Sequence, residues 1–248
     1  MIKFFSKIRQ RLLTENKFSK YLLYAIGEIV LVVIGILIAL SINTWNHNLA
    51  DEKKSKIILE NLHEEFVLHK EKLAFALPNY AIGINANINL VNLCGHDSIT
   101  LTALQIDTIL SQTFKGAPFN PPQPILDELL NTGNLNLIQN KKLQQYLFEW
   151  ESKNKHFKLV YSAYWQFDSD QLAPYLNKHW SWKNLEIAGG TAYWKDRSKL
   201  KTNVNAMFQD IEFENLFTTN AFHLTRLQNE LKQMDQLLIS IIAETEIN

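Results

Sequence analysis

The sequence predicts an all-α protein, with one transmembrane helix near the N-terminus that continues into an elongated extracytoplasmic helical bundle. Two patterns favour this fold: a long apolar run at residues 21–42, and apolar residues that recur every three or four positions afterwards. The alternating pattern of a strand is scarce. Only Asn134–Ile138 and the surroundings of Gly189 and Gly190 could be extended.

The apolar run from Tyr21 to Ile42 has the length of a membrane span, and Glu28 is its only charged residue. About 20 residues rising ~1.5 Å each cross a hydrocarbon layer of ~30 Å. Tyr24 and Trp45 lie near its two ends, where aromatic side chains are enriched at membrane interfaces. We therefore expect residues 21–43 to form a transmembrane helix in contact with the lipid bilayer.

A cleavable signal peptide is the alternative interpretation of this run, with Ala39-Leu-Ser41 as a small-x-small cleavage site. Apolar cores of signal peptides usually span ~7–15 residues, and this one is longer and contains Glu28. A buried core helix is excluded, because such a helix does not need apolar residues on every face over this length. We expect the segment to be retained as an anchor.

The distribution of basic residues predicts the orientation. Residues 1–20 contain six Lys and Arg residues, whereas only three lysines follow the span within twenty residues. The positive-inside rule therefore places the N-terminus in the cytoplasm and residues 44–248 outside it. Phe5, Ile8 and Leu12 are spaced for an amphipathic helix on the cytoplasmic membrane surface, so residues 1–20 form a basic amphipathic segment in this interpretation.

One face of the predicted span has the composition of a helix-packing surface. At 100° per residue, Gly35, Ala39 and Asn46 lie within about 20° of Glu28. Gly35 and Ala39 form a small-xxx-small pair, which permits close approach of another helix, and an intramembrane carboxyl group usually faces a partner or water. The partner would be a second copy of the chain or another membrane protein. The alternative is that Glu28 snorkels or is protonated and that the small residues are incidental.

The N-terminal region also resembles a known family. The segments Met1–Leu13, Lys20–Leu40 and Ile42–Asn46 resemble an uncharacterised family of single-span membrane proteins from Bacteroidota, and Leu129–Asn140 carries a weaker similarity. The resemblance is dense over residues 1–60. It implies an inner-membrane location with the domain in the periplasm, and it implies no activity. The positions that match the family pattern are Gly27, Glu28, Gly35, Trp45 and Asn46.

Three heptad-like seams predict the long helices of the domain. The first runs from Leu59 to Ala76, the second from Leu143 to Tyr164 and the third from Leu224 to Ile241. Nothing between the span and the first seam breaks a helix, and we expect Pro78 to end it. Packing within one bundle is the first interpretation of these seams, and a parallel dimer is the second.

Shorter helices are predicted between these seams. Residues 84–91 form a helix closed by Gly95, and Thr102–Gln105 is a capping box that opens the next one. Residues 125–130 form a further short helix that ends near Gly133.

Two breaks in the helical pattern supply the candidate binding residues. Residues 115–124 contain four prolines and a glycine, which predicts an exposed loop that carries Phe119. The second break, from Pro174 to Lys199, contains Trp180, Trp182, Tyr193 and Trp194. Aromatic clusters bind sugars or partner side chains, but they also fill the ends of helical bundles, and a proline-rich loop can be a plain connector.

Charge and motif content exclude several functions. The residues after the span contain 19 Lys and Arg against 23 Asp and Glu, so a nucleic-acid partner is not expected. Cys94 is the only cysteine, which rules out an intrachain disulfide and a cysteine-rich metal site. The seven histidines form no zinc-binding spacing, and no P-loop, dinucleotide fingerprint or nucleophile elbow occurs. The sequence therefore predicts no metal, no cofactor and no catalytic residue.

These observations favour a membrane-anchored cell-envelope protein that is an interaction, scaffold or accessory module. Its periplasmic bundle would bind a protein partner or a small signal. The alternative is a periplasmic enzyme with its site near the proline-rich loop and the tryptophan cluster. A polar pocket with converging His, Asp or Glu side chains would favour the enzyme, whereas an apolar or aromatic groove would favour binding.

Overall fold

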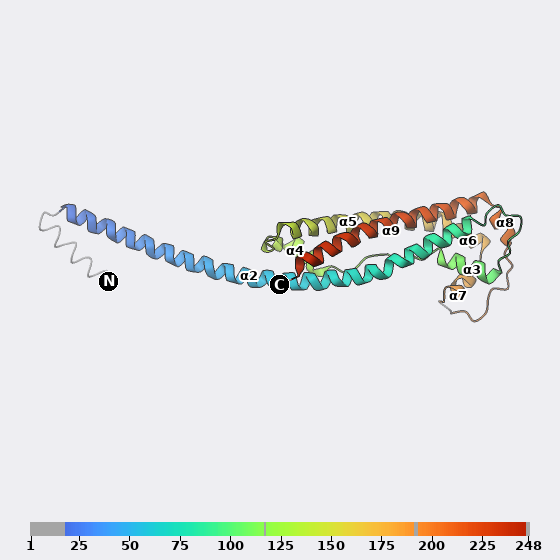
Figure 1. Ribbon diagram of the computed structural model, residues 1–248, viewed down its shortest axis with the longest axis horizontal. Coiled ribbons are helices and arrows are strands. Elements are labelled where there is room, and N and C mark those ends of the chain that lie inside the picture. Colours follow the sequence, from blue (N-terminus) through green and yellow to red (C-terminus); the bar gives the residue numbers. More distant parts are fainter. Residues whose placement is uncertain (1–17, 117, 191–192, 247–248) are drawn as a thin grey trace. The chain divides into compact units, whose positions relative to one another are not determined.

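The computed structural model describes residues 18–116, 118–190 and 193–246. All regular structure in these ranges is helical, which confirms the all-α prediction (Figure 1). The chain divides into two compact units, Met1–Lys56 and Ile57–Asn248, which are described separately. The predicted amphipathic helix with Phe5, Ile8 and Leu12 lies outside the described residues.

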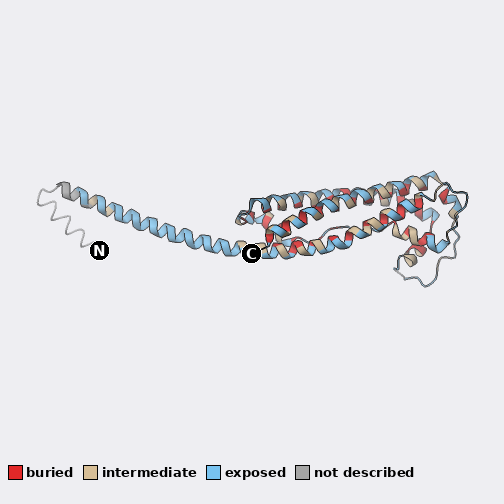
Figure 2. Ribbon diagram, in the orientation of Figure 1, coloured by how far each residue is buried: buried red, intermediate tan, exposed pale blue. Residues whose placement is uncertain are grey.

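The first unit contains the beginning of α2, the helix Phe18–Val91. Every residue from Ile29 to Lys54 is exposed, including the continuous apolar run to Leu40 (Figure 2). Among the described residues, one helix is long and apolar enough to cross a membrane, and this run is its most apolar part. No protein atoms of the described residues cover this run, so its apolar side chains are more favourable in lipid than in water.

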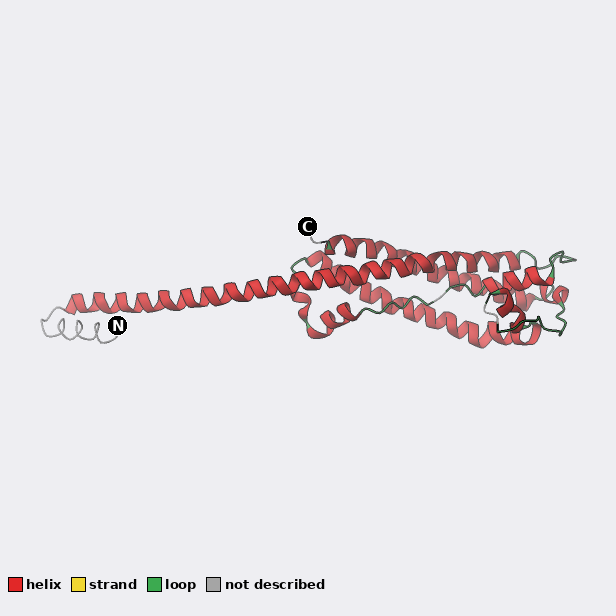
Figure 3. Ribbon diagram, turned by 90° about the horizontal axis from the view of Figure 1, so that it is seen from below, coloured by secondary structure: helices red, strands yellow, loops and turns green. Residues whose placement is uncertain are grey.

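The second unit is built on three long helices that lie side by side in two views (Figures 1 and 3). They are the part of α2 that follows Lys56, α5 (Lys141–Phe167) and α9 (Ile211–Thr245). The predicted seams supply the core, with Leu62, Phe66, Trp150, Leu231 and Leu238 each fully buried. The three seams thus pack on one another within the chain, as the first interpretation of the heptads predicts.

Pro78 does not end the first long helix, contrary to the sequence prediction. Helix α2 continues through Pro78 to Val91, so the separate helix expected at residues 84–91 is its last part. Pro78 is on the exposed side of the helix, where the carbonyl group that loses its partner can be hydrated. The Asn79 side chain also donates to the Phe75 carbonyl oxygen at 2.9 Å.

Seven shorter helices complete the described part of the domain. The capping box at Thr102 is confirmed at the start of α3, and Gly133 ends α4 in the left-handed conformation, with φ of 74°. Asn134–Leu137 forms a 3-10 helix, so the extended structure considered there is wrong. The bounds are α3 Ala103–Gln112, α4 Pro124–Thr132, η1 Asn134–Leu137, η2 Asp168–Leu172, α6 Ala173–His179, α7 Trp182–Ala188 and α8 Val204–Phe208.

Residues 114–116 and 118–123, which we call the strap, run lengthwise over the bundle (Figure 3). The Lys115 carbonyl oxygen lies against Gly83, and the Pro122 carbonyl oxygen accepts a hydrogen bond from His69. The strap therefore runs antiparallel to α2, from the level of Gly83 toward that of His69. The predicted exposed loop is therefore wrong in one respect: its large apolar residue, Phe119, is only 3% exposed.

Candidate functional site

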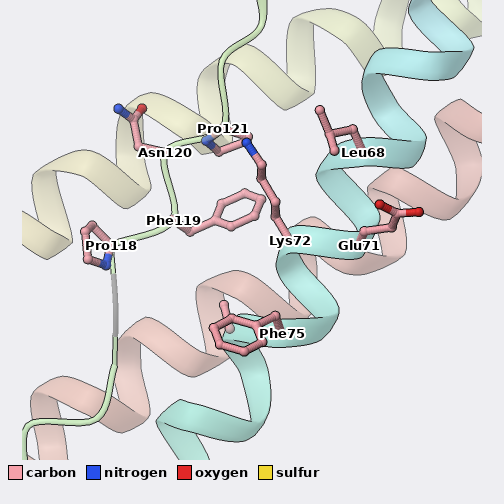
Figure 4. Close-up of a pocket in the computed structure, with 9 residues that line it drawn as sticks. Leu68, Glu71, Lys72, Phe75, Pro118, Phe119, Asn120 and Pro121 are labelled. Atoms are coloured by element: carbon pink, nitrogen blue, oxygen red, sulfur yellow. The ribbon is translucent and has the colours of Figure 1, made fainter. Parts of the chain in front are cut away.

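An open groove of about 500 Å³ lies between α2 and the strap (Figure 4). Its α2 wall includes Leu68, Phe75 and Ala76, and its strap wall includes Pro118 and Pro121. We call it the strap groove. Its position follows from the proline-rich sequence, because prolines 118 and 121 favour an extended backbone that leaves space beside a helix.

The surface of the strap groove is mainly apolar. Phe75 is 76% exposed and Leu68 is 43% exposed, although both belong to a helix that buries its opposite face. Phe119 forms the base and makes edge-on ring contacts with Trp150 and Phe157, at 6.4 and 6.3 Å between centroids. The groove therefore offers two accessible apolar side chains above an aromatic base that is fixed in the core.

Two charged residues of α2, Glu71 and Lys72, also line the strap groove. Lys72 extends toward Pro121, whereas Glu71 points away from Phe119 (Figure 4). Neither residue forms an ion pair in the described part of the chain. The strap groove therefore resembles a binding surface with a polar rim. It lacks the cluster of acid and base groups that a catalytic site needs.

A buried polar network fixes the strap behind the groove. The Gln123 amide accepts hydrogen bonds from the Trp150 indole at 3.1 Å and from Asn154 at 3.0 Å. Its amide nitrogen donates to Asp127 at 2.9 Å and to Glu151 at 2.8 Å. One side chain of the strap thus joins α4 and α5, which holds the groove wall in place.

His69 is a second attachment point of the strap. Its Nε2 donates to the Pro122 carbonyl oxygen at 2.9 Å, and its ring stacks on Trp150 at 5.5 Å. Burial lowers the pKa of His69, the hydrogen bond to Pro122 opposes this, and the nearby Lys72 charge lowers the pKa further. His69 is therefore a structural group of the core, and its lowered pKa favours the neutral imidazole.

Glu65 holds the beginning of α4. Its carboxylate accepts hydrogen bonds from the Ile125 and Leu126 amides at 2.8 and 3.3 Å. Burial raises the pKa of Glu65, while these two amides act in the opposite direction. The sequence pattern does not single out Glu65 as a structural group. The available signal was α4 itself, because a helix that begins Gln123-Pro124 lacks a capping Ser, Thr, Asp or Asn and needs another acceptor.

Trp180, one of the predicted binding residues, is a core residue at the α3–α7 end of the bundle. It is 6% exposed, and its indole donates to Asp107 at 2.9 Å. Asp107 is fully buried and also forms an ion pair with Arg197. Burial raises the pKa of Asp107, whereas Trp180 and Arg197 lower it. The exposed aromatic surface expected at this position is therefore not formed by Trp180.

The other two predicted tryptophans are more accessible. Trp182 packs on Phe114 at 5.4 Å and donates to Asn177, whereas Trp194 is 46% exposed. The Trp194 indole donates to Glu186 at 2.6 Å, and the Lys183 ammonium lies 5.3 Å from its ring. The structure does not bring Trp180, Trp182 and Trp194 onto one open surface with Phe119, so ligand binding by these residues stays a prediction.

The predicted membrane face belongs to the first unit. Gly35, Ala39 and Asn46 are exposed, and a Cβ atom at Gly35 would contact nothing within 4 Å. Glu28 is partly covered. The spacing of these residues on one helix is as expected, and their role in helix packing stays a prediction.

No metal centre is formed in the described part of the chain, because no three His, Cys, Asp or Glu side chains converge there. Cys94 is half-buried, and burial raises its pKa to about 11, so the thiol is a weak nucleophile at neutral pH.

A family model described as a family of unknown function (DUF6090) matches residues 28–75. This match agrees with the resemblance to an uncharacterised family, and the matched residues end at Phe75 in the α2 wall of the strap groove. No curated protein matches the chain, and no solved structure matches it.

Proposed function

We propose that this chain is a membrane-anchored binding module whose strap groove receives apolar side chains of a partner protein. The observation that carries the proposal is the exposure of Leu68 and Phe75 beside the fixed Phe119. Exposed apolar surface of this kind, bordered by polar residues, is typical of interaction sites.

The side of α2 that faces away from the core extends this surface. Leu68, Phe75 and Ile82 are each at least 42% exposed, and their spacing of seven residues places them along one line. Glu64 and Glu71 are exposed on the same side, and neither forms an ion pair among the described residues. This arrangement favours an amphipathic partner helix with apolar residues at heptad spacing and Lys or Arg beside them.

The anchor is the second part of the proposal. The apolar residues of the first unit support insertion into a bilayer, and the basic residues before them support a cytoplasmic N-terminus and a periplasmic domain. Alkaline phosphatase fused after Asn248 is then expected to be active. An inactive fusion together with an active cytoplasmic reporter at the same position would reverse the orientation.

Within the membrane, we propose that Glu28, Gly35, Ala39 and Asn46 face a second helix, either a second copy or a partner membrane protein. Glu28→Gln retains the length of the side chain and removes the charge. We expect insertion to be unchanged and crosslinking between spanning helices to decrease. Unchanged crosslinking in the Glu28→Gln protein would remove this part of the proposal.

A binding role is favoured over an enzymatic one by the nature of the residues near the proline-rich loop. Phe119, Gln123 and His69 are engaged in packing or hydrogen bonds, and no nucleophile with an adjacent base lies on the groove wall. We accordingly propose no catalytic residue, no cofactor and no nucleic-acid partner for this chain.

The experiment is a purification of the full-length protein from its native membranes in mild detergent, followed by native sizing and mass spectrometry. A stoichiometric partner is expected with the wild type and should be lost with Phe75→Asp. Phe148→Asp is the matched control, because Phe148 is 57% exposed on α5 and does not line the groove. Equal recovery of the partner with both variants, or a protein without any partner, would contradict the proposed site.

A further inference from the structure

A second opening lies in the domain between α6 and the beginning of α9, and its volume is about 510 Å³. Phe167 packs on His223, and Tyr175 contacts Phe213, so η2 and α6 run antiparallel to α9 along this opening. We call it the α6–α9 pocket. It differs from the strap groove because its walls carry charges of both signs.

Four acidic or basic side chains line the α6–α9 pocket: Asp170, Lys178, His179 and Glu212. None of them forms an ion pair in the described part of the chain. Asp170 lies at the η2 end, whereas the other three lie at the end where α6 finishes and α9 begins. The pKa of the neighbouring Asp210 is lowered by hydrogen bonds from Tyr175 and from the Glu212 amide, and by the charge of His179. His179 therefore already has an acidic neighbour, whereas Asp170 and Lys178 are exposed and available to a ligand.

The base of the pocket is fixed. Tyr175 is 4% exposed, and its hydroxyl donates to Asp210 at 2.7 Å. Asp210 in turn caps α9 by accepting from the Glu212 amide at 2.9 Å. The His179 ring stacks on Tyr175 with 4.3 Å between centroids, so the imidazole is held over the same base.

A π-helical turn, η2, gives the pocket its shape. The Ala173 amide bonds to the Asp168 carbonyl oxygen, five residues back, and Pro174 follows directly. Pro174 lacks an amide hydrogen and would crowd the Asp170 carbonyl group in a regular helix, so the wider turn accommodates it. Single π turns within helices occur often at functional sites.

We propose that the α6–α9 pocket binds a short peptide with free termini, with its carboxylate at Lys178 and its amine at Asp170. Asp170 and Lys178 are eight residues apart, or ~12 Å along the helix, which is the length of an extended tetrapeptide. Asn215 and Thr219 lie on the opposite wall and supply hydrogen-bonding groups for a peptide backbone. Pro174 and Leu216 supply apolar contact between the charged ends.

The test is calorimetric titration of the full-length protein in lipid nanodiscs with tetra-alanine. We expect saturable binding, and no binding of N-acetyl-tetra-alanine amide or of free alanine. Absence of saturable binding up to ~10 mM tetra-alanine would overturn the proposal, because a dissociation constant above this value is too weak for a specific site. Equal binding of the blocked peptide would also overturn it, and equal binding of alanine would replace the peptide by a single amino acid.

Variants locate the site. Lys178→Met and Asp170→Asn are each expected to weaken binding roughly tenfold, because each removes one charge-assisted contact. Lys232→Met is the matched control: it lies on α9, thirteen residues or ~20 Å beyond Thr219, and its ammonium bonds only to Gln228 among the described residues. Equal affinities of Lys178→Met and Lys232→Met would contradict the assignment.

The Glu212→Gln variant tests the direction in which the peptide lies. Glu212 is at the same end as Lys178, so its negative charge opposes the peptide carboxylate there. Its removal is expected to strengthen binding several-fold. Weaker binding would show that the amine, not the carboxylate, occupies this end, and would overturn the proposed orientation. Phe75→Asp should leave peptide affinity unchanged, which separates this pocket from the strap groove.

Discussion

Two stretches of α2 belong to the same helix but have different surroundings. From Ile29 to Leu40 the side chains are apolar on all sides and are exposed. From Leu62 to Leu90 one face is buried in the bundle, and the opposite face combines charged residues with Leu68, Phe75 and Ile82. Both stretches are helical, so helix formation alone does not predict the surroundings of a segment. The distribution of apolar residues around the helix does: apolar residues on all sides suit lipid, and an apolar face suits a bundle core.

The largest expected effect is a difference in the free energy of unfolding between substitutions on the buried and on the exposed face of the second stretch. Phe66 is fully buried against His69 and Trp150, whereas Phe75 is 76% exposed. Phe66→Ala should lower the free energy of unfolding by ~3–5 kcal/mol, because it removes a buried ring and leaves a cavity. Phe75→Ala, the matched control, should change it by less than about 0.5 kcal/mol. Denaturant unfolding of the full-length protein in detergent measures both, and similar losses would contradict the assigned faces.

A smaller effect is expected at two glycines of α2, Gly83 in the bundle and Gly27 near the N-terminal end of the helix. A Cβ atom at Gly83 would clash with the Lys115 carbonyl oxygen, so Gly83→Ala must displace the strap. We expect a loss of ~1–3 kcal/mol in the free energy of unfolding. Gly27→Ala is the control, because a Cβ atom there meets nothing within 4 Å. If Gly83→Ala is as stable as Gly27→Ala, the strap does not pack on α2 as described.

Removal of the Glu65 carboxylate tests whether the second stretch caps the N-terminus of α4. Glu65→Ala removes the acceptor of two amides, and a loss of ~1–2 kcal/mol is expected from uncapping the helix. Glu64→Ala is the neighbouring control on the exposed side and should have almost no effect. Thermal unfolding of the three proteins gives the comparison, and equal midpoints would show that Glu65 does not cap α4.

The smallest effect concerns pH. The pKa of His69 is below the 6.5 of a free histidine, so the unfolded chain binds a proton where the folded protein does not. Stability should therefore fall as the pH decreases from about 6.5 through the pKa of the folded state. His69→Gln retains a donor for Pro122 and does not titrate. The wild type should lose more stability between pH 7.5 and 5.5 than this variant.

The comparison with His69→Gln is needed because other titratable groups change the stability with pH in the opposite direction. Burial raises the pKa values of Glu65 and Asp107, so these carboxyl groups favour the folded state at lower pH. They are present in both proteins and cancel in the difference. Equal losses of stability in the wild type and in His69→Gln would contradict a neutral, buried His69.

The sequence predicted the features that depend on local pattern. The three seams, the capping box at Thr102 and the Gly133 helix end were correct, because heptad spacing and cap residues act over a few positions. It failed at Pro78, where the outcome depends on which side of the helix meets solvent. It also failed at Phe119 and Trp180, because burial of a loop residue depends on distant partners such as Trp150 and Asp107.

The candidate sites were less predictable than the fold. The strap groove combines residues 68–76 with residues 118–121, and nothing in their local sequence shows that they meet. The α6–α9 pocket likewise needs the π turn at η2, which the sequence indicates only through the position of Pro174. Both openings arise from packing between segments that are far apart in the chain.

The most direct test of the central claim is photocrosslinking in intact membranes, with p-benzoylphenylalanine placed at residue 75 or at residue 148 of the full-length chain. Both positions carry exposed phenylalanines, and only Phe75 lines the strap groove. A binding module predicts a discrete adduct from position 75 that disappears with Leu68→Asp, and none from position 148. Its mass would distinguish a second copy from another protein. No adduct at position 75, or the same adducts at both positions, would contradict the account.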